Sequence, residues 1–160
     1  MKHNEVYKLI KDGRYNDAAF MLLDSASPQP PLKINSPGDA FPLLRKYGAK
    51  RKEYFIVLIL NGAHEIVREE IVSIGLMNRT VVHPREVFYP AILYNSAAVL
   101  IAHNHPSGNL TPSPEDREIT SRLHDSAKIL GIALLDHLII SSRGYYSFIE
   151  HGLLEPFTAD

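Results

Sequence analysis

The sequence of 160 residues contains no cysteine. This absence excludes a disulfide framework, a thiolate zinc site and a cysteine nucleophile, because each of these needs the sulfur of a cysteine. Any transition-metal site in this chain must therefore be built from His, Asp and Glu side chains.

A basic excess and long apolar runs are also missing. The formal net charge is -1 at pH 7, whereas nucleic-acid binders usually carry a positive balance. DNA is a possible partner that the net charge does not support, although Lys50, Arg51 and Lys52 form a local basic cluster. No segment is long enough to span a bilayer, and the N-terminus lacks the apolar core of a signal peptide. We expect a cytoplasmic protein without membrane contact.

The first 31 residues differ from the remainder in their pattern. Apolar spacing over residues 4–24 predicts two short helices that are separated at Asp12-Gly13. The proline-rich stretch 25–31 (SASPQPP) cannot continue a helix and is typical of a linker. We therefore predict a short helical extension with a Pro-rich linker over residues 1–31, and one main domain over residues 32–155.

Strands alternate with helices in the main body, which predicts an α/β fold with a mixed sheet flanked by helices. Ser36 and Pro37 are typical of a helix start, Gly48 of a helix stop, and Asn61-Gly62 of a hairpin between two strands. The predicted strands cover 54–60, 64–74, 97–102 and 132–140 with a return at 144–148, and the predicted helices cover 37–47, 83–95 and 114–130. Of the helix at 83–95, we expect Val87, Phe88, Ala91, Ile92 and Tyr94 to cover the inner side.

The most informative segment is HNHPSGNLTPSPED, residues 103–116, which directly follows a predicted buried strand. Side chains two apart in an extended chain point to the same face, so His103 and His105 would converge. Neutral imidazole is a common zinc ligand, and Asp116 offers a third, anionic ligand at the start of the next helix. Two histidines and one carboxylate leave a fourth position for water, which is typical of a catalytic metal site.

The same residues also have purely structural interpretations. Two histidines at a strand end are often exposed polar residues. The spacing of Ser113 and Asp116 is that of a capping box, in which Ser113 caps the helix and Asp116 offsets the helix dipole. The structural and the metal interpretations are compatible, since a capped helix would fix the direction in which Asp116 points.

The pattern H-x-H-x7-S-x2-D resembles the metal signature of the JAMM (MPN-plus) metalloprotease-like family. The segments HNHPSG, TPSPED and LLDHLII resemble its bacterial RadC-like branch, over roughly residues 36–150. This resemblance implies a JAB/MPN-like domain with a cytidine-deaminase-like architecture. RadC-like proteins of typical length also carry an N-terminal helix-hairpin-helix region, which the first 35 residues do not resemble.

The resemblance also implies roles for individual residues. It implies one zinc ion per chain, held by His103, His105 and Asp116, with Ser113 steadying the oxyanion. The general base of the family is a glutamate at the head of the first core strand, which corresponds to Glu53 in KEYFIVLIL. Glu86 is the second candidate for the base, although a solvated glutamate in a first helical turn explains it more simply.

The resulting prediction is a zinc-dependent hydrolase of peptide or isopeptide bonds that uses a metal-activated water, with an unknown substrate and oligomeric state. The alternatives are a DNA-repair-associated factor and a non-catalytic interaction module that keeps the metal. We expect His137 to be a satisfied polar strand residue, bonded by Asp136 or by a group beside the metal site. Surface positions are predicted for His3, His64, His83, His124 and His151.

Overall fold

The protein is described from a computed structural model, which places residues 2–13, 31–75 and 82–157. The chain divides into two compact units, Met1–Pro31 and Leu32–Asp160, and each is described by itself. The first unit contains helix α1, Lys2–Lys11. This helix ends at Asp12 and Gly13, where φ of Gly13 is 74°, so the predicted break is confirmed. The second predicted helix and most of the linker lie outside the described residues.

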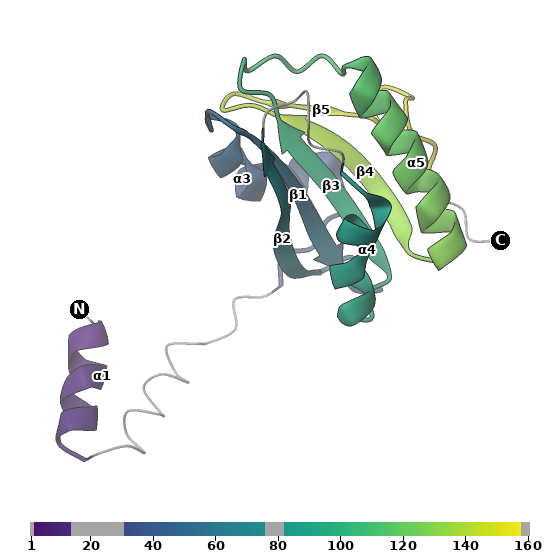
Figure 1. Cartoon of the computed structure of the whole chain (residues 1–160). Helices are drawn as coiled ribbons and strands as arrows, with labels where there is room; N and C mark the ends of the chain where they lie inside the picture. The colour runs from purple at the N-terminus through teal and green to yellow at the C-terminus, as the bar shows by residue number, and fades with distance from the viewer. Residues whose placement is uncertain (1, 14–30, 76–81, 158–160) are drawn as a thin grey trace. The chain divides into compact units, whose positions relative to one another are not determined.

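The larger unit is built on one mixed five-stranded sheet (Figure 1). The strand order is β2-β1-β3-β4-β5; only β3 and β4 pair in parallel, and the other neighbours are antiparallel. Strands β1 and β3 are almost fully buried, which explains their near-continuous apolar sequences. The predicted α/β class with a mixed sheet is confirmed. The strands are β1 Glu53–Leu60, β2 Ile66–Gly75, β3 Ala98–Asn104, β4 Ala133–Ile140 and β5 Tyr145–Ser147.

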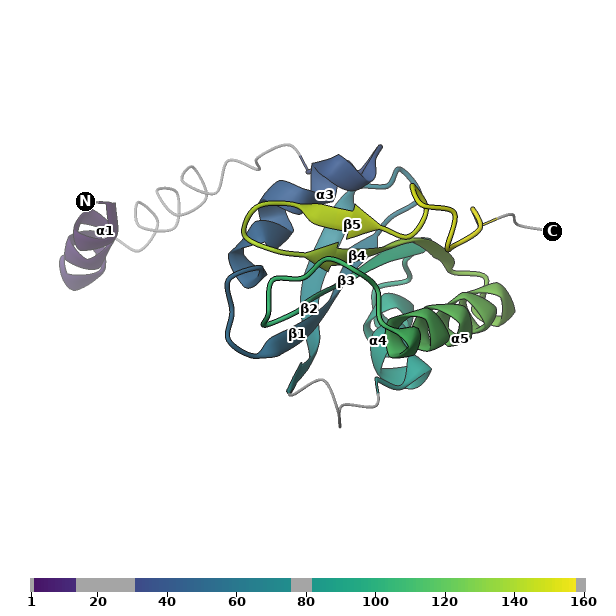
Figure 2. The same cartoon turned by 90° about the horizontal axis from the view of Figure 1, so that it is seen from above.

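Helices cover both faces of this sheet. Helix α3, Pro37–Leu44, continues into the 3-10 helix η1, Arg45–Tyr47, and covers one face. Helices α4, Pro84–Leu93, and α5, Pro114–Leu130, cover the other (Figure 2). Each face has its own apolar core. The core under α4 and α5 includes Val57, Ile59, Val87, Phe88, Val99, Ile101 and Leu123, and the core under α3 includes Ala40, Leu44, Ile56, Leu58 and Leu100.

Most predicted boundaries are confirmed within two residues, and one detail of α4 is wrong. Within the predicted inner side of α4, Ile92 is 56% and Tyr94 is 39% exposed. Tyr94 caps the end of the helix, and the buried stripe consists of Val87, Phe88 and Ala91. The hairpin predicted at Asn61-Gly62 is confirmed, because β1 and β2 pair antiparallel and Leu60 pairs with Ile66 across the turn. Side-chain Oδ1 of Asn61 stabilises this turn by accepting from the N–H groups of residues 63 and 65.

The prediction for His124 is also wrong. His124 is buried on α5, because it lies on the same helical stripe as Thr120, Leu123 and Ala127, which face the sheet. His64, His83 and His151 are exposed as predicted, and the side chain of His3 lies outside the described residues.

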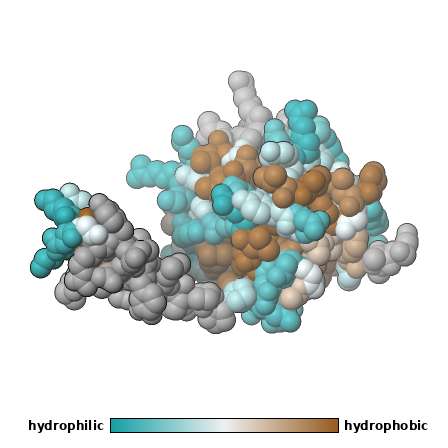
Figure 3. Space-filling view, turned by 90° about the horizontal axis from the view of Figure 1, so that it is seen from below, coloured by the Kyte–Doolittle hydropathy of each residue, from teal (hydrophilic) through white to brown (hydrophobic). Residues whose placement is uncertain are grey.

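Part of the surface is apolar. Leu93 on α4 and Ile129 and Leu130 on α5 are exposed near the C-terminal ends of their helices. The view from below shows apolar areas interleaved with hydrophilic ones on that face (Figure 3). Among the described residues, none of the helices has the length and apolar character needed to cross a bilayer.

Gly48 permits a close approach between η1 and the end of β4. A Cβ atom at position 48 would lie 2.1 Å from the carbonyl carbon of Ser141, which is closer than real Cβ contacts. We expect Gly48→Ala to lower the free energy of unfolding by about 1–3 kcal/mol, because the backbone must shift to relieve this overlap. Gly62→Ala is the control, since a Cβ there meets nothing within 4 Å. Urea denaturation measures both, and equal stabilities would contradict the packing argument.

Candidate metal centre

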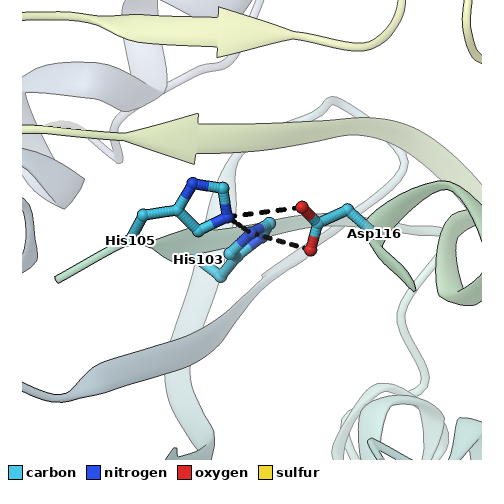
Figure 4. A group of neighbouring side chains, drawn as sticks. All are labelled: His103, His105 and Asp116. Atoms are coloured by element: carbon cyan, nitrogen blue, oxygen red, sulfur yellow. Dashed lines mark hydrogen bonds and ion pairs between the residues drawn. The ribbon is translucent and has the colours of Figure 1, made fainter. Parts of the chain in front are cut away.

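His103, His105 and Asp116 come together at the end of β3 (Figure 4). His103 is the second-to-last residue of β3, His105 follows the strand, and Asp116 lies in the first turn of α5. The two imidazoles share one face because side chains alternate along a strand. All three side chains are buried, so they are held away from bulk water.

The donor atoms of these residues have the spacing of a metal site. Nε2 of His103 lies 3.0 Å from Nε2 of His105 and 3.1 Å from Oδ1 of Asp116. Nε2 of His105 lies 3.3 Å from Oδ2 of Asp116. A tetrahedral zinc ion with bonds of about 2.0–2.1 Å would separate its ligands by about 3.3–3.4 Å. The three side chains therefore fit a divalent metal ion, and they supply three of four tetrahedral positions.

The loop after β3 fixes the orientation of His105. Its Nδ1 lies 2.8 Å from the backbone carbonyl oxygen of Asn109. Because a carbonyl oxygen only accepts, Nδ1 must carry a proton and donate it. In the neutral imidazole the lone pair is then on Nε2, which is the atom that faces Asp116. Gly108 allows the loop to turn, with φ of 75°.

The capping box predicted for α5 is present as well. Oγ of Ser113 accepts from the N–H of Asp116 at 3.1 Å, and Oδ2 of Asp116 accepts from the N–H of Ser113 at 2.7 Å. The structural interpretation of this pair is therefore confirmed, and it coexists with the grouping of Asp116 and the histidines. The cap holds the carboxylate in place, and the second oxygen, Oδ1, faces His103.

The electrostatics of the centre favour a cation. Burial acts to raise the pKa of the Asp116 carboxyl, but hydrogen bonds with His103 and His105 outweigh burial and leave the pKa well below its usual range. The hydrogen bond with Asp116 raises the pKa of His105, while burial opposes this shift. In the metal-free protein the site therefore attracts a proton to the position where a metal ion would bind, and metal binding would release protons.

Glu53, the first residue of β1, lies close enough to His103, His105 and Asp116 for their charges to affect its pKa. Burial raises the pKa of its carboxyl, nearby His103 and His105 lower it, and the charge of Asp116 raises it. Its Oε2 atom is buried and has no hydrogen-bond partner among the described residues, which is unusual for a carboxylate oxygen. Such an atom is available to bind a water molecule or a substrate group. Glu86, by contrast, is an exposed residue in the first turn of α4.

Asn104 and Thr120 lie around the centre but were not recognised from the sequence, and the contacts of His137 were recognised only in part. Asn104 lies between the two histidines in the sequence, and its side chain is fully buried. Its Oδ1 accepts from the N–H of Tyr54 at 2.8 Å, and its Nδ2 donates to the carbonyl oxygens of Lys50 and Lys52. It therefore fixes the entry into β1 and the position of Glu53. The only sequence signal for Asn104 is its place inside the H-x-H motif.

The other two residues are His137 and Thr120. Nε2 of His137 lies 2.8 Å from Nδ1 of His103, and Nδ1 of His137 lies 2.6 Å from Oγ1 of Thr120. Burial holds the pKa of the His137 imidazole well below its usual value, so the ring is neutral. His137 is a satisfied polar residue as predicted, but Asp136 accepts from its backbone N–H rather than from its ring. For Thr120, the available signal was its position one helical turn after Asp116.

Comparison with known proteins agrees with this arrangement. A family model described as the RadC-like JAB domain matches residues 34–153. Over 123 residues the chain is 48% identical to a UPF0758 protein of Trichlorobacter lovleyi, covering 76% of this chain and 54% of the relative. UPF0758 proteins of Rubrobacter xylanophilus and Methanosarcina mazei are 46% and 43% identical, over 76% and 83% of this chain and 53% and 58% of theirs.

This chain therefore spans about half the length of the curated relatives that it matches. The match covers all the strands and the three clustered side chains, so the fold described above is that of a JAB domain. The chain belongs to the RadC-like JAB-domain family, a branch of the JAMM/MPN-like proteins.

Proposed function

We propose that this protein is a zinc-dependent hydrolase of amide bonds, with a peptide or an isopeptide as substrate. The observation that carries this proposal is the buried cluster of His103, His105 and Asp116, whose ligand atoms all lie within 4.8 Å of one another. Glu53 lies close enough for the charges of these three residues to affect its pKa, and its Oε2 atom has no hydrogen-bond partner among the described residues. A cluster that served only the fold would not need this additional half-buried acid.

Zinc is the proposed ion because the donors are two imidazole nitrogens and a carboxylate oxygen at tetrahedral spacing. When bound, a zinc ion supplies Lewis-acid activation and lowers the pKa of water from 15.7 to about 7. His103, His105 and Asp116 would hold the ion, and Asp116 would contribute the single negative charge among them.

Glu53 is the proposed general base. Its carboxyl is half-buried, and burial raises its pKa toward the range in which it both takes and returns a proton. We assign to Glu53 the removal of a proton from the attacking water. The same oxygen would then deliver that proton to the leaving amine, so that the base is regenerated in each cycle.

Ser113 has a hydroxyl proton available for the substrate. Its Oγ accepts from the N–H of Asp116, and this bond uses a lone pair of the oxygen rather than its proton. The proton can therefore be donated to the oxyanion that forms when water attacks the amide carbonyl. The capping bond would keep Oγ in a fixed position for this task.

Ser113→Ala separates the two roles of this side chain. Loss of the cap is expected to cost about 1 kcal/mol of stability, and loss of an oxyanion donor is expected to lower kcat by about 10²–10³. Thermal unfolding reports the first effect, and steady-state kinetics at equal zinc content report the second. A destabilised variant with unchanged kcat would show that Ser113 acts as a cap alone.

The function is tested by metal analysis of the purified chain, followed by cleavage of peptide and isopeptide libraries. We expect one zinc ion per chain and cleavage that stops on addition of a chelator and resumes with zinc. A chain that binds zinc and cleaves neither library would favour a non-catalytic module. A chain that binds no divalent metal would refute the proposal.

A further inference from the structure

On the side that faces away from the candidate metal centre, His103 contacts His137, and His137 in turn contacts Thr120. Nδ1 of His103 lies 2.8 Å from Nε2 of His137 on β4, and Nδ1 of His137 lies 2.6 Å from Oγ1 of Thr120 on α5. All three side chains are at most 2% exposed. Buried polar groups are nearly always hydrogen-bonded, so each of these contacts needs one donor and one acceptor.

The direction of each hydrogen bond follows from the contacts of Thr120, the last residue of this series. Oγ1 of Thr120 also lies 2.5 Å from the backbone carbonyl oxygen of Asp116. A carbonyl oxygen has no proton to give, so the single hydroxyl proton of Thr120 is donated to Asp116. In its contact with His137, Oγ1 can therefore only accept. The ring proton of His137 must then be on Nδ1.

The second step applies the same argument to His137. Its ring is fully buried, and a buried imidazole is favoured in its neutral form, which carries one proton. With that proton on Nδ1, Nε2 of His137 is a pure acceptor. The contact at 2.8 Å therefore requires His103 to donate from Nδ1. The ring nitrogen of His103 that remains for a metal ion is Nε2, and this is the atom that faces His105 and Asp116.

We infer that Thr120 and His137 form a hydrogen-bond relay, a series of buried hydrogen bonds that sets the tautomer of His103. This tautomer presents the Nε2 lone pair of His103 to the metal centre. His137 and Thr120 are positioning residues, since they act through His103. The relay is electrically neutral, unlike the carboxylate that often orients a metal-bound histidine. Phe55 stacks on the ring of His103, and Phe148 stacks on the ring of His137, so packing fixes both ring planes.

The relay can be read directly in the wild-type protein by ¹⁵N NMR of the histidine rings. We expect His137 to carry its proton on Nδ1 with Nε2 unprotonated, and His103 to be protonated on Nδ1, with and without zinc. A proton on Nε2 of His137 would overturn the inference. The role of the Nε2 lone pair of His103 as a metal ligand rests on the proposed function. The positions of the ring protons are also measured in zinc-free protein. Failure of zinc binding would therefore be distinguished from failure of the relay.

Variants at Thr120 test the effect of the relay on metal binding. Thr120→Val keeps the shape of the side chain but removes the acceptor for His137, and we expect zinc affinity to fall about 10–100-fold. Thr120→Ser keeps the hydroxyl, so its zinc affinity is expected to stay close to that of wild type, without the loss of about 10–100-fold expected for Thr120→Val. An equal zinc affinity in Thr120→Val and wild type would contradict the positioning role.

Ser126 provides the matched control. It lies on the same helix, and its Oγ donates to the carbonyl oxygen four residues earlier, as that of Thr120 does. Ser126→Ala therefore removes the same kind of helix hydrogen bond without contacting His137, and zinc affinity should be unchanged. If Ser126→Ala lowered the affinity as much as Thr120→Val, the effect would belong to the stability of α5 rather than to the relay.

Discussion

Replacement of Glu53 by Gln is expected to lower turnover by about 10²–10⁴-fold while leaving one zinc ion per chain. Glutamine has nearly the same shape as glutamate, so the start of β1 should be undisturbed. The amide of glutamine cannot take a proton from water. The buried Oε2 of Glu53 can, because no hydrogen-bond donor among the described residues occupies it. Zinc content and kcat should be measured on the same preparation.

Glu86→Gln is the matched control for this experiment. Glu86 was the second candidate for the base on sequence grounds, and the structure places it on the exposed surface of α4. We expect Glu86→Gln to retain wild-type activity. Full activity in Glu53→Gln together with loss in Glu86→Gln would transfer the role of base to Glu86.

His103→Ala is expected to abolish stoichiometric zinc binding. Only two of the three donors would remain, and the negative charge of Asp116 would be left beside His105 alone. Zinc should fall from one per chain to a trace after dialysis, as measured by elemental analysis. His64→Asn is the control, because His64 is exposed and has φ of 60°, a conformation that Asn tolerates. Its zinc content should equal that of wild type.

Asp116→Asn provides an independent test should the cavity in His103→Ala impair folding. Asn keeps the size of the side chain, and its amide oxygen can still accept from the N–H of Ser113. It removes the negative charge that attracts a cation to the centre. Retention of one tightly bound zinc ion by both folded variants would show that the ligands were assigned wrongly.

The cluster of His103, His105 and Asp116 could be predicted from the sequence, because the spacing rules that bring these side chains together are local. His103 and His105 share a face through the two-residue period of a strand, and Asp116 is placed by the cap of α5. The buried strands β1 and β3 were likewise visible as apolar runs. Glu53 is different: its candidacy came from family resemblance, because no local rule brings the start of β1 next to the end of β3.

Other features depend on how α5 and β4 pack against each other. The contact between Thr120 and His137 requires the register of a helix against a strand, which periodicity does not supply. His124 was missed for another reason: its polar side chain predicted a surface position, but its helical position beside Leu123 and Ala127 places it toward the sheet. Asn104 could not be recognised, because its partners at Lys50, Lys52 and Tyr54 are joined to it only by strand pairing.

The three clustered donors lie within one continuous stretch, residues 103–116, whereas Glu53 enters from a distant part of the chain. The ion binding and the acid–base chemistry proposed above would thus depend on separate segments that meet only in the folded sheet. Substitutions within residues 103–116 that change the proposed ligands would therefore leave Glu53 in place, because it lies on a separate strand. For an engineer, the two properties can be adjusted one at a time.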